Sequence, residues 1–485
     1  MLINKKEPTC VNYTMEDYFL TNLSFACIIS SVAVLTIKRQ RRRTVDKNKK
    51  NFIRLDEKRR GELSDTFIAF ANKRIIGQPR IIKTFAKMIE RDNAGFRSRT
   101  KPAASVFIAG PSGVGKTEAV KVFAEFLLGN LGAITRIDCQ EFSEAHNVAG
   151  LKGPPPGYIG HGHEPRITQE KLDRWGYKKI LKEFFLSLEE EQKAEVEELE
   201  RELIKLTNTI KSLQTQKAAA SATERLRLTE LKNELRKLDY PMFDKSGKTK
   251  YSSVFLLDEL ERADKSFYNI LYTILDEAYL PVVAYDDSEG NSIERIQFHN
   301  TFLFATSNTG HEGVRELLNI NSGKSTGMKF CGSSVVENTD EAIYDSCKKD
   351  VNRTFETSFL GRFDYFLVAR PLYRPEIRSI VDLQITQLVT TLKKEWDCAL
   401  HLDIDEPARE FIADESNDDP TKGARLVQKK IKNLLVDPLT SLRATGQIFP
   451  GDHVRINLEV KDDKRHLAFY REELKKSMIL RPSAK

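Results

Sequence analysis

The chain has few of the residues that build metal clusters, disulfide frameworks or proteolytic sites. Its 485 residues include six cysteines, and no two of them form a CxxC pair. This spacing argues against a zinc site and against a disulfide scaffold, so a reducing compartment is expected. The chain also lacks the HExxH sequence, which argues against a zinc-protease active site of its own.

An excess of basic over acidic charge is confined to one segment. The formal net charge is +7, yet residues 38–60 alone hold twelve Lys or Arg against three Asp or Glu. The remainder of the chain is therefore slightly acidic. A nucleic-acid binder more often spreads basic charge over a folded face, so the composition argues against nucleic acid as a partner.

One run of the chain lacks charge altogether. Residues 18–37 read YFLTNLSFACIISSVAVLTI, and a helix of this length spans about 30 Å, the thickness of a hydrocarbon core. KRQRRR follows at once, so the positive-inside rule predicts a single-pass membrane anchor with the long carboxy-terminal part of the chain in the cytoplasm. A buried helix or an uncleaved signal remnant is the alternative. The basic run after it is then expected to lie against anionic lipid head groups. The alternative is that this run is a nuclear localisation signal or binds nucleic acid.

What the chain does contain is a strand, a glycine-rich loop and a helix in residues 105–128, SVFIAGPSGVGKTEAVKVFAEFLL. The loop has the spacing Gly110-x-x-x-x-Gly115-Lys116-Thr117. Glycines let backbone amides point at phosphates, the lysine reaches the β- and γ-phosphate oxygens, and the threonine hydroxyl ligates magnesium. The segment therefore predicts a site for ATP and Mg²⁺.

Two further apolar strands end in side chains that such a site needs. SSVFLLDELERA places Asp258 for magnesium and Glu259 as the base that orients the attacking water. TFLFATSN ends in Asn308, where a polar side chain is expected to reach the γ-phosphate or that water. Strand, phosphate loop, helix and further strands in this order predict an α/β fold with a parallel, doubly wound sheet and the ligand at the carboxyl ends of its strands.

Beyond these motifs the chain resembles the Clp family of AAA+ ATPases. RIIGQPRIIKTFAKMIERDNAGF is similar to the family's opening segment, and RIDCQEFSEAHNVAGLKGPPPGYIG to the stretch that leads into its pore loop. ERADKSFYNILYTILDEAYL resembles the helix after the magnesium carboxylate, and SFLGRFDYFLVARPL the segment of the arginine finger. IRSIVDLQITQLVTTL and DPTKGARLVQKKIKNLLVDPLTSLRATGQIFPGDHVRINLEV look like the small carboxy-terminal domain, with helices first and a short strand pair last.

The resemblance assigns roles to further residues. It implies that Ile76 lies near the adenine, that Arg362 contacts the γ-phosphate bound by the neighbouring subunit, and that Arg425 senses the γ-phosphate within its own subunit. The family usually has asparagine before the finger, whereas this chain has Gly361. The predicted catalytic residues are Glu259, Arg362 and Asn308, and the predicted cofactor-binding residues are Ile76, Gly110, Gly113, Gly115, Lys116, Thr117, Glu118, Asp258 and Arg425, with Thr117 and Asp258 as metal ligands.

Tyr158 and Ile159 lie within LKGPPPGYIGHG, whose prolines and glycines exclude a helix or a central strand. In Clp-type motors the loop that corresponds to GYIG projects into the channel of a hexameric ring, where its aromatic residue grips an extended polypeptide. The resemblance therefore implies a homo-oligomer, a polypeptide substrate and a gripping pair at these two residues. The alternative is that Tyr158 packs under its own loop.

The chain departs from the family by an insertion of about eighty residues, well beyond ordinary loop lengths. Apolar residues recur in it at steps of three and four, first at Val196, Leu199, Leu203, Leu206, Ile210 and Leu213, and then at Leu228, Leu231, Leu235 and Leu238. This periodicity predicts an antiparallel helical hairpin about 30 Å long. The hairpin docks a partner, regulates the ring or serves as a spacer, and two helices that cover each other's apolar seam need no partner at all.

The loop GKSTGMKFCGSS stands where protease-coupled relatives carry a hydrophobic tripeptide that docks on the peptidase ring. Met328 and Phe330 flank Lys329 there. A lysine would place a charge in an apolar docking pocket, which is costly. The loop therefore argues against a peptidase partner.

Together these features predict a membrane-anchored, ring-forming ATPase that unfolds or remodels proteins by threading them through its pore. The alternatives are a non-threading membrane switch of the torsin kind, a coiled-coil scaffold whose ATPase only controls assembly, and a nucleic-acid motor that uses residues 38–60. The predicted parts are a tail at 1–17, the anchor at 18–37, a basic linker at 38–64, a large ATPase domain at 65–370 with the hairpin at 173–250, a small domain at 371–462, and a polar tail at 463–485 without an assigned role.

Overall fold

The computed structural model divides the chain into Met1–Arg59 and Arg60–Lys485, and the fold below is that of the second unit. The predicted anchor at 18–37 lies outside the described residues, and no helix within the described part is long and apolar enough to cross a membrane. The structure describes residues 56, 59–96, 98, 100–152, 166–215, 221–238, 240–241, 251–286, 290–317, 333–394, 400–416, 423–461 and 463–472.

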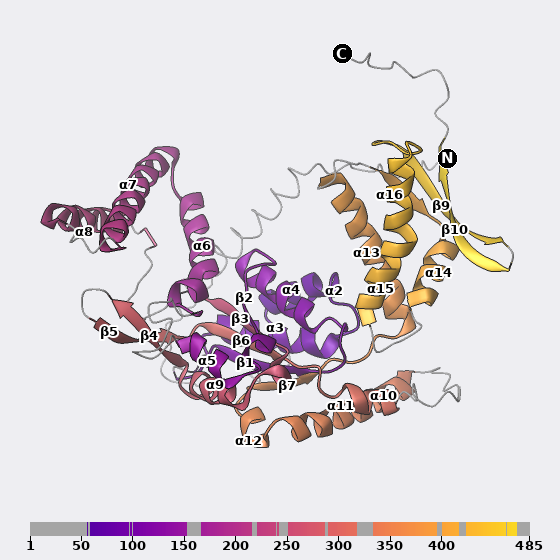
Figure 1. The fold of residues 1–485 in the computed structure, drawn as a ribbon, viewed down its shortest axis with the longest axis horizontal. Coiled ribbons are helices and arrows are strands. Elements are labelled where there is room, and N and C mark those ends of the chain that lie inside the picture. The colour runs from indigo at the N-terminus through magenta and orange to yellow at the C-terminus, as the bar shows by residue number, and fades with distance from the viewer. Residues whose placement is uncertain are drawn as a thin grey trace, which may run out of the picture. The chain divides into compact units, whose positions relative to one another are not determined.

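A five-stranded sheet in the order β2-β3-β6-β1-β7 forms the centre of the ATPase fold (Figure 1). All of its strand pairs are parallel, which confirms the predicted parallel α/β sheet. Every residue of β1, β3 and β6 is buried, because helices cover both faces of the sheet. The strands are β1 (Ala104–Ala109), β2 (Thr135–Asp138), β3 (Ser253–Asp258), β6 (Thr301–Thr306) and β7 (Tyr365–Val368).

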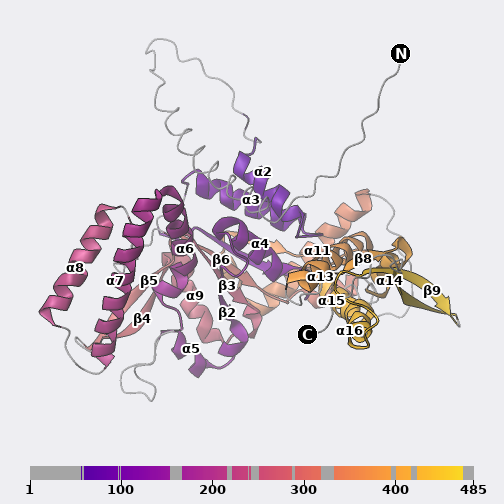
Figure 2. The ribbon, with the colours of Figure 1, turned by 90° about the horizontal axis from the view of Figure 1, so that it is seen from above.

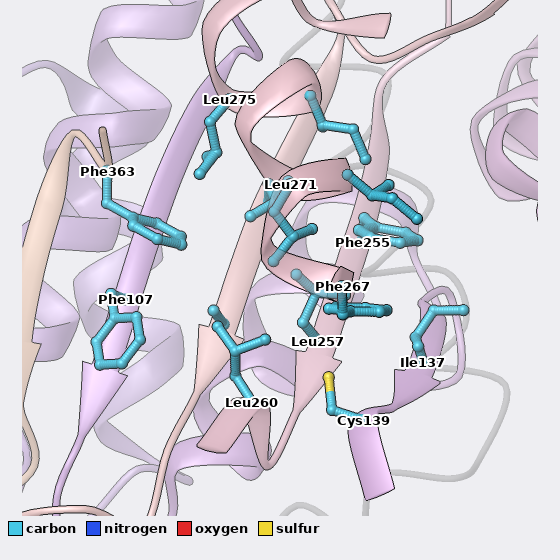
Figure 3. Packing of buried hydrophobic residues seen from close by; sticks show 14 of the residues in the cluster. Phe107, Ile137, Cys139, Phe255, Leu257, Leu260, Phe267, Leu271, Leu275 and Phe363 are labelled. Carbon is cyan, nitrogen blue, oxygen red and sulfur yellow. The ribbon is translucent and has the colours of Figure 1, made fainter. Parts of the chain in front are cut away.

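The two faces of this sheet carry separate hydrophobic cores, because side chains alternate along each strand. On β3, Val254 and Leu256 face one core, while Phe255 and Leu257 face the other. Figure 3 shows the second core, where Phe267 of α9 packs against β3. The helices of the first core are α2 (Glu62–Asn72), α3 (Pro79–Asn93) and α4 (Lys116–Leu128), and those of the second are α5 (Ala145–Lys152), α9 (Lys265–Glu277), α10 (His311–Leu317), α11 (Ser333–Thr354) and α12 (Thr357–Leu360), with 3₁₀ turns at Cys139–Phe142 and Leu260–Arg262.

An antiparallel strand pair extends from the second core. It consists of β4 (Tyr279–Asp286) and β5 (Gly290–Gln297). Leu280 and Ile296 face each other across the pair and are both buried in the core. The sequence analysis did not predict this pair, because part of it reads as a polar, acidic stretch without regular alternation.

The insertion and the residues just before it form three helices, and the last two make the antiparallel hairpin that the leucine spacing predicts (Figure 2). Val196 and Leu235 are buried between these two helices, and Arg227 Nε donates to Glu202 Oε1 at 2.9 Å. The remaining helix, α6, precedes the hairpin along the chain. Its residue Leu172 lies in the sheet core, whereas its later side chains pack on the hairpin. The helices are α6 (Gln169–Ser187), α7 (Glu190–Thr215) and α8 (Ala222–Lys237).

The carboxy-terminal part has its own core, formed by residues from Leu372 to Ile456. Its sheet has three strands in the order β10-β9-β8, where the sequence analysis expected a strand pair and a polar tail from residue 463. The extra strand forms because Leu467 and Phe469, two residues apart on one face of the strand, pack on this core. The elements are α13 (Arg374–Lys394), β8 (His401–Ile404), α14 (Glu406–Ser416), α15 (Gly423–Ile431), a π-helical turn (Lys432–Val436), α16 (Asp437–Ala444), β9 (His453–Lys461) and β10 (Lys464–Arg471).

Candidate nucleotide site

The loop between β1 and α4 carries three glycines in the left-handed region. Their φ angles are +133° at Gly110, +78° at Gly113 and +98° at Gly115, values that residues with a side chain rarely adopt. A Cβ atom at Gly110 would lie only 2.4 Å from the carbonyl oxygen of Ala369, directly after β7. The loop therefore needs glycine to turn tightly onto the amino terminus of α4, an arrangement that favours anions.

Lys116 is buried at the base of this loop. Its Nζ donates to the carbonyl oxygens of Gly110 and Pro111, both at 2.7 Å, and to Oδ1 of Asn308 at 3.0 Å. Burial lowers the pKa of Lys116 to about 8, while the nearby Glu261 carboxylate acts in the opposite direction. The structure thus brings the loop lysine and the polar side chain after β6 into direct contact.

Asp258 ends β3 and is contacted from three strands or helices. Its Oδ1 accepts a hydrogen bond from Thr117 Oγ1 at 3.2 Å and another from the Thr306 hydroxyl, and its Oδ2 lies 2.7 Å from Arg136 Nη2. A hydroxyl and a carboxylate are the hard oxygen donors that Mg²⁺ prefers, so Thr117 and Asp258 fit this ion. Among the described residues no group of three or more His, Cys, Asp or Glu could hold a metal, so phosphate oxygens and water would have to complete the coordination.

Glu259 follows with φ +56° and ψ +51°, a conformation that is uncommon for a residue other than glycine. Its backbone N donates to Thr306 Oγ1 at 3.2 Å, and its Oε1 accepts from Asn308 Nδ2 at 3.1 Å. The backbone N of Asn308 in turn donates to Glu261 Oε1 at 3.0 Å. This turn holds the predicted base beside Asn308, whose amide group therefore bridges Glu259 and Lys116.

The segment before α3 ties the phosphate loop to the chain just before the small domain. Gln78 Nε2 donates to the carbonyl oxygens of Val114 at 3.2 Å and of Arg370 at 2.8 Å, and its Oε1 accepts from the backbone N of Arg370 at 3.1 Å. Ile76, two residues earlier, packs against the core of the small domain. Its predicted place near the adenine stays a prediction, although it does lie at the junction of the two parts.

The small domain reaches the phosphate loop through the start of α15. Arg425 Nη1 donates to Ser112 Oγ at 2.7 Å, and the backbone N of Ala424 donates to the carbonyl oxygen of Gly113 at 2.8 Å. Gly423 has φ +52°, and a Cβ atom there would lie 2.5 Å from the same carbonyl oxygen. The close approach requires glycine, and it sets the Arg425 side chain against the phosphate loop.

Arg362 lies between α12 and the edge strand β7. Its Nε donates to Asp276 Oδ2 at 2.8 Å, its Nη1 donates to the carbonyl oxygen of Ser358 at 2.6 Å, and its guanidinium lies 4.3 Å from the centre of the Tyr272 ring. These described contacts are with α9 and α12 and not with the phosphate loop of its own chain. A role toward a neighbouring subunit stays a prediction.

Three further predicted site residues are not brought into this group. Glu118 is half-exposed at the start of α4, where its carboxylate lies 3.7 Å from Lys121 Nζ, so its predicted contact with the cofactor stays a prediction. Tyr158 and Ile159 lie outside the described residues, and so does the loop around Lys329.

Sequence reasoning missed two charged residues of the site, Arg136 and Glu261. Arg136 stands on β2, two residues before Asp138, which pairs in register with Asp258. Residues two apart on a strand share a face, so this register brings the guanidinium to the carboxylate. The only signal in the sequence is the RIDCQEF stretch, and it does not reveal that this strand neighbours β3.

Comparison with known proteins places this fold and site in a family. A family model described as an AAA domain (Cdc48 subfamily) matches residues 101–180 and 183–366, and one described as the C-terminal, D2-small domain of ClpB protein matches residues 372–456. The chain belongs to the AAA family of ATPases, and ATP hydrolysis is the activity that membership implies. The ClpB-type small domain assigns it to the Clp branch.

Individual relatives agree with this branch. The chain is similar to the ATP-dependent Clp protease ATP-binding subunit ClpC of Staphylococcus saprophyticus, with 27% identity over 395 residues, 81% of this chain and 36% of the relative. It is also 27% identical over 387 residues to the chaperone protein ClpB of Rhodopseudomonas palustris, 80% of this chain and 32% of the relative. The chain thus spans about a third of the length of these curated relatives.

A solved structure has a similar fold. It is described as a closed-state cryo-EM reconstruction of Hsp104 with ATPyS and FITC casein, and it superposes with a TM-score of 0.53 over 84% of this chain and 52% of that chain. At 20% sequence identity, this similarity concerns the fold alone.

Proposed function

We propose that this chain is an ATP-driven remodelling ATPase of the Clp type, which assembles as a hexameric ring and threads polypeptides past Tyr158 and Ile159. The observation that carries the proposal is the convergence of Lys116, Asp258 and Arg425 on one phosphate loop from the large and small domains. Relatives named as a chaperone and as a protease ATP-binding subunit support a protein substrate.

The described contacts suggest how the residues act on ATP. A bound phosphate would replace the Gly110 and Pro111 carbonyl oxygens as acceptors of the Lys116 ammonium. Thr117 and Asp258 would hold Mg²⁺, which when bound neutralises phosphate charge. Glu259 would orient the attacking water and take up its proton.

Three side chains complete this mechanism. Asn308, hydrogen-bonded to both Lys116 and Glu259, would keep the carboxylate of Glu259 aimed at the γ-phosphate. Arg425 reports on the nucleotide within its own subunit, and Arg362 on that of the neighbouring subunit. Both arginines carry a permanent charge, so they stabilise negative charge that develops in the transition state.

The proposal includes a membrane location. The uncharged run at 18–37 would anchor the chain, with the basic segment and the ATPase domain on the cytoplasmic side. The ATPase would then act on proteins at that membrane. The proposal includes no peptidase partner, because Lys329 breaks the apolar docking sequence.

The test is ATP turnover of the full chain with and without a permanently unfolded model protein. We expect stimulation in the wild type and in Tyr158→Phe, which keeps the aromatic ring, and loss of stimulation with intact basal turnover in Tyr158→Ala. Equal stimulation of all three proteins would reject threading past Tyr158. Turnover that ignores the unfolded protein in the wild type would favour the non-threading switch.

A further inference from the structure

The inserted helices present a second apolar surface beside the seam that holds them together. The seam is formed by Val196, Leu199 and Leu203 of α7 with Leu235 of α8. Ile204 directly follows Leu203, and one residue of an α-helix turns the chain by about 100°. Its side chain therefore points away from the seam, and it is 52% exposed.

A hollow of about 390 Å³ lies on this second face, and it is lined by Phe185, Glu197, Glu200, Arg201 and Ile204. The four lining residues of α7 follow the spacing i, i+3, i+4 and i+7, which is one continuous stripe of a helix. Phe185 comes from α6 and is half-buried. We call this hollow the α6–α7 groove. Phe185 also packs against the core of the hairpin, whereas Ile204 does not belong to that core.

The groove is set in an acidic surface. Residues 189–202 contain eight Glu against Lys193 and Arg201. Some of this charge is already compensated, since Arg201 Nη2 lies 3.0 Å from Glu197 Oε2 and Glu200 Oε1 accepts a hydrogen bond from the Tyr240 hydroxyl at 2.8 Å. The segment nevertheless remains strongly acidic, so it attracts basic partners and repels acidic ones.

One wall of the groove belongs to a helix that also contributes to the core of the sheet. α6 runs from the sheet core, where Leu172 is buried, to the groove at Phe185. A Cβ atom at Gly176 would lie 2.3 Å from the carbonyl oxygen of Ser252, just before β3. The helix that forms one wall of the groove is therefore pressed against the strand that ends in Asp258.

We propose that the α6–α7 groove is a docking site for a basic amphipathic helix of a partner protein. The partner inserts an apolar side chain between Phe185 and Ile204 and sets Lys or Arg side chains against Glu197 and Glu200. An apolar floor with an acidic rim matches this chemistry, because a helix laid in a groove offers apolar anchors at the same i, i+4, i+7 spacing. The proposal does not depend on threading or on a membrane.

The test uses the full chain and a fluorescein-labelled synthetic helix of Leu and Lys, with Leu at the anchor positions. Two matched peptides separate the causes of binding, one with Ala in place of Leu and one with Glu in place of Lys. We expect the Leu–Lys peptide to bind about tenfold more tightly than the Ala–Lys peptide, and the Leu–Glu peptide not to bind. Fluorescence anisotropy measures each affinity.

Variants then locate the binding surface. Ile204→Ser should weaken binding of the Leu–Lys peptide about tenfold, whereas Leu226→Ser, which changes a 62% exposed side chain of α8 that does not line the groove, should leave it unchanged. Glu197→Gln should weaken binding about threefold and lower its salt dependence. The matched Glu198→Gln, next to the groove but not lining it, should have less effect.

Several results would overturn the proposal. They are absence of binding to the wild type, equal affinity for the Ala–Lys peptide, and equal binding by wild type and Ile204→Ser. Because Ile204 is already exposed, its replacement should leave the far-ultraviolet circular dichroism unchanged, and this measurement verifies that the variant folds. A self-associated form that Ile204→Ser dissolves, seen by sedimentation, would mean that a second copy of this chain fills the groove instead of a partner.

Discussion

The nucleotide site and the inserted hairpin are held together in opposite ways. Contacts of the site join residues far apart in the chain, as in Arg425 with Ser112 and Lys116 with Asn308. Contacts of the hairpin join near neighbours, as in Glu202 with Arg227, and its small core is separate from those of the sheet. The ATPase chemistry therefore depends on the convergence of many elements, whereas the hairpin is a locally specified module that can be altered alone.

The largest effect should come from the centre of the convergent region. Glu259→Gln keeps the shape of the side chain and its place beside Asn308 but removes the proton acceptor. We expect ATP turnover to fall by about 10²–10⁴, with nucleotide affinity within a factor of about two of the wild type. Turnover and binding of a fluorescent ATP analogue measure the two quantities. A variant with intact turnover would remove Glu259 from the role of base.

The next prediction tests whether the hairpin is a separate module. Leu235→Ala deletes a fully buried side chain of the hairpin core and should cost about 2–5 kcal/mol of local stability, seen as faster hydrogen exchange in α7 and α8. ATP turnover should stay near the wild-type value. The matched change Phe123→Ala, in the core beneath the phosphate loop, should cost about 3–5 kcal/mol and abolish nucleotide binding. Loss of ATP binding in Leu235→Ala would contradict the comparison.

How far the sequence predicts each region follows from the same difference. Lys116, Asp258 and Asn308 could be predicted together, because each follows an apolar strand and parallel strands end at one edge of a sheet. Arg136 could not, because only the register of β2 against β3 brings it to Asp258. That register is a long-range property that no local pattern contains.

The hairpin shows the complementary case. Its seam can be predicted from the sequence, because Val196 and Leu235 recur at helical spacing. The groove cannot, because Phe185 comes from a neighbouring helix whose start precedes the insertion. β10 was missed for a related reason, since its Leu467 and Phe469 signal a strand only when the core beneath them is known. Local spacing thus predicts elements and seams, while surfaces shared between elements require the structure.

The affinity for ATP should depend on pH, whereas binding in the α6–α7 groove should not depend on it in the same way. Burial lowers the pKa of Lys116 to about 8 in the free protein, so its ammonium is charged below that pH and becomes neutral above it. Because phosphate binding needs the charge, ATP affinity should fall as pH rises through 8, by about tenfold for each further pH unit. Isothermal titration calorimetry, with ATP and with adenosine each titrated into the protein at several pH values, measures both affinities. Adenosine affinity, without phosphates, should change little, and an ATP affinity that is flat from pH 7 to 9 would reject the shifted pKa. Binding in the α6–α7 groove should not follow this titration.

The smallest effect concerns Arg136, the residue that joins the site from the edge of the sheet. Its guanidinium lies 2.7 Å from Asp258 Oδ2, but its side chain is 54% exposed, so solvent screens the pair. A magnesium ion held by Asp258 must share this carboxylate with the arginine. Removing the guanidinium should therefore raise the affinity for the ion, by about threefold in Arg136→Ala and not in Arg136→Lys, which keeps the charge.

This prediction is measured by titrating Mg²⁺ into the Glu259→Gln protein with a fluorescent ATP analogue, where hydrolysis does not interfere. A half-saturating Mg²⁺ concentration that falls in Arg136→Ala alone would mean that β2 supplies a competing cation, and that Arg136 tunes how readily the metal enters. A half-saturating Mg²⁺ concentration that rises in both variants would instead mean that the guanidinium orients Asp258. The pairing of β2 with β3 also allows this role. In either case the change in Mg²⁺ affinity originates in the pairing of β2 with β3, which brings Arg136 to Asp258. A substitution in the hairpin, by contrast, would affect only the hairpin itself.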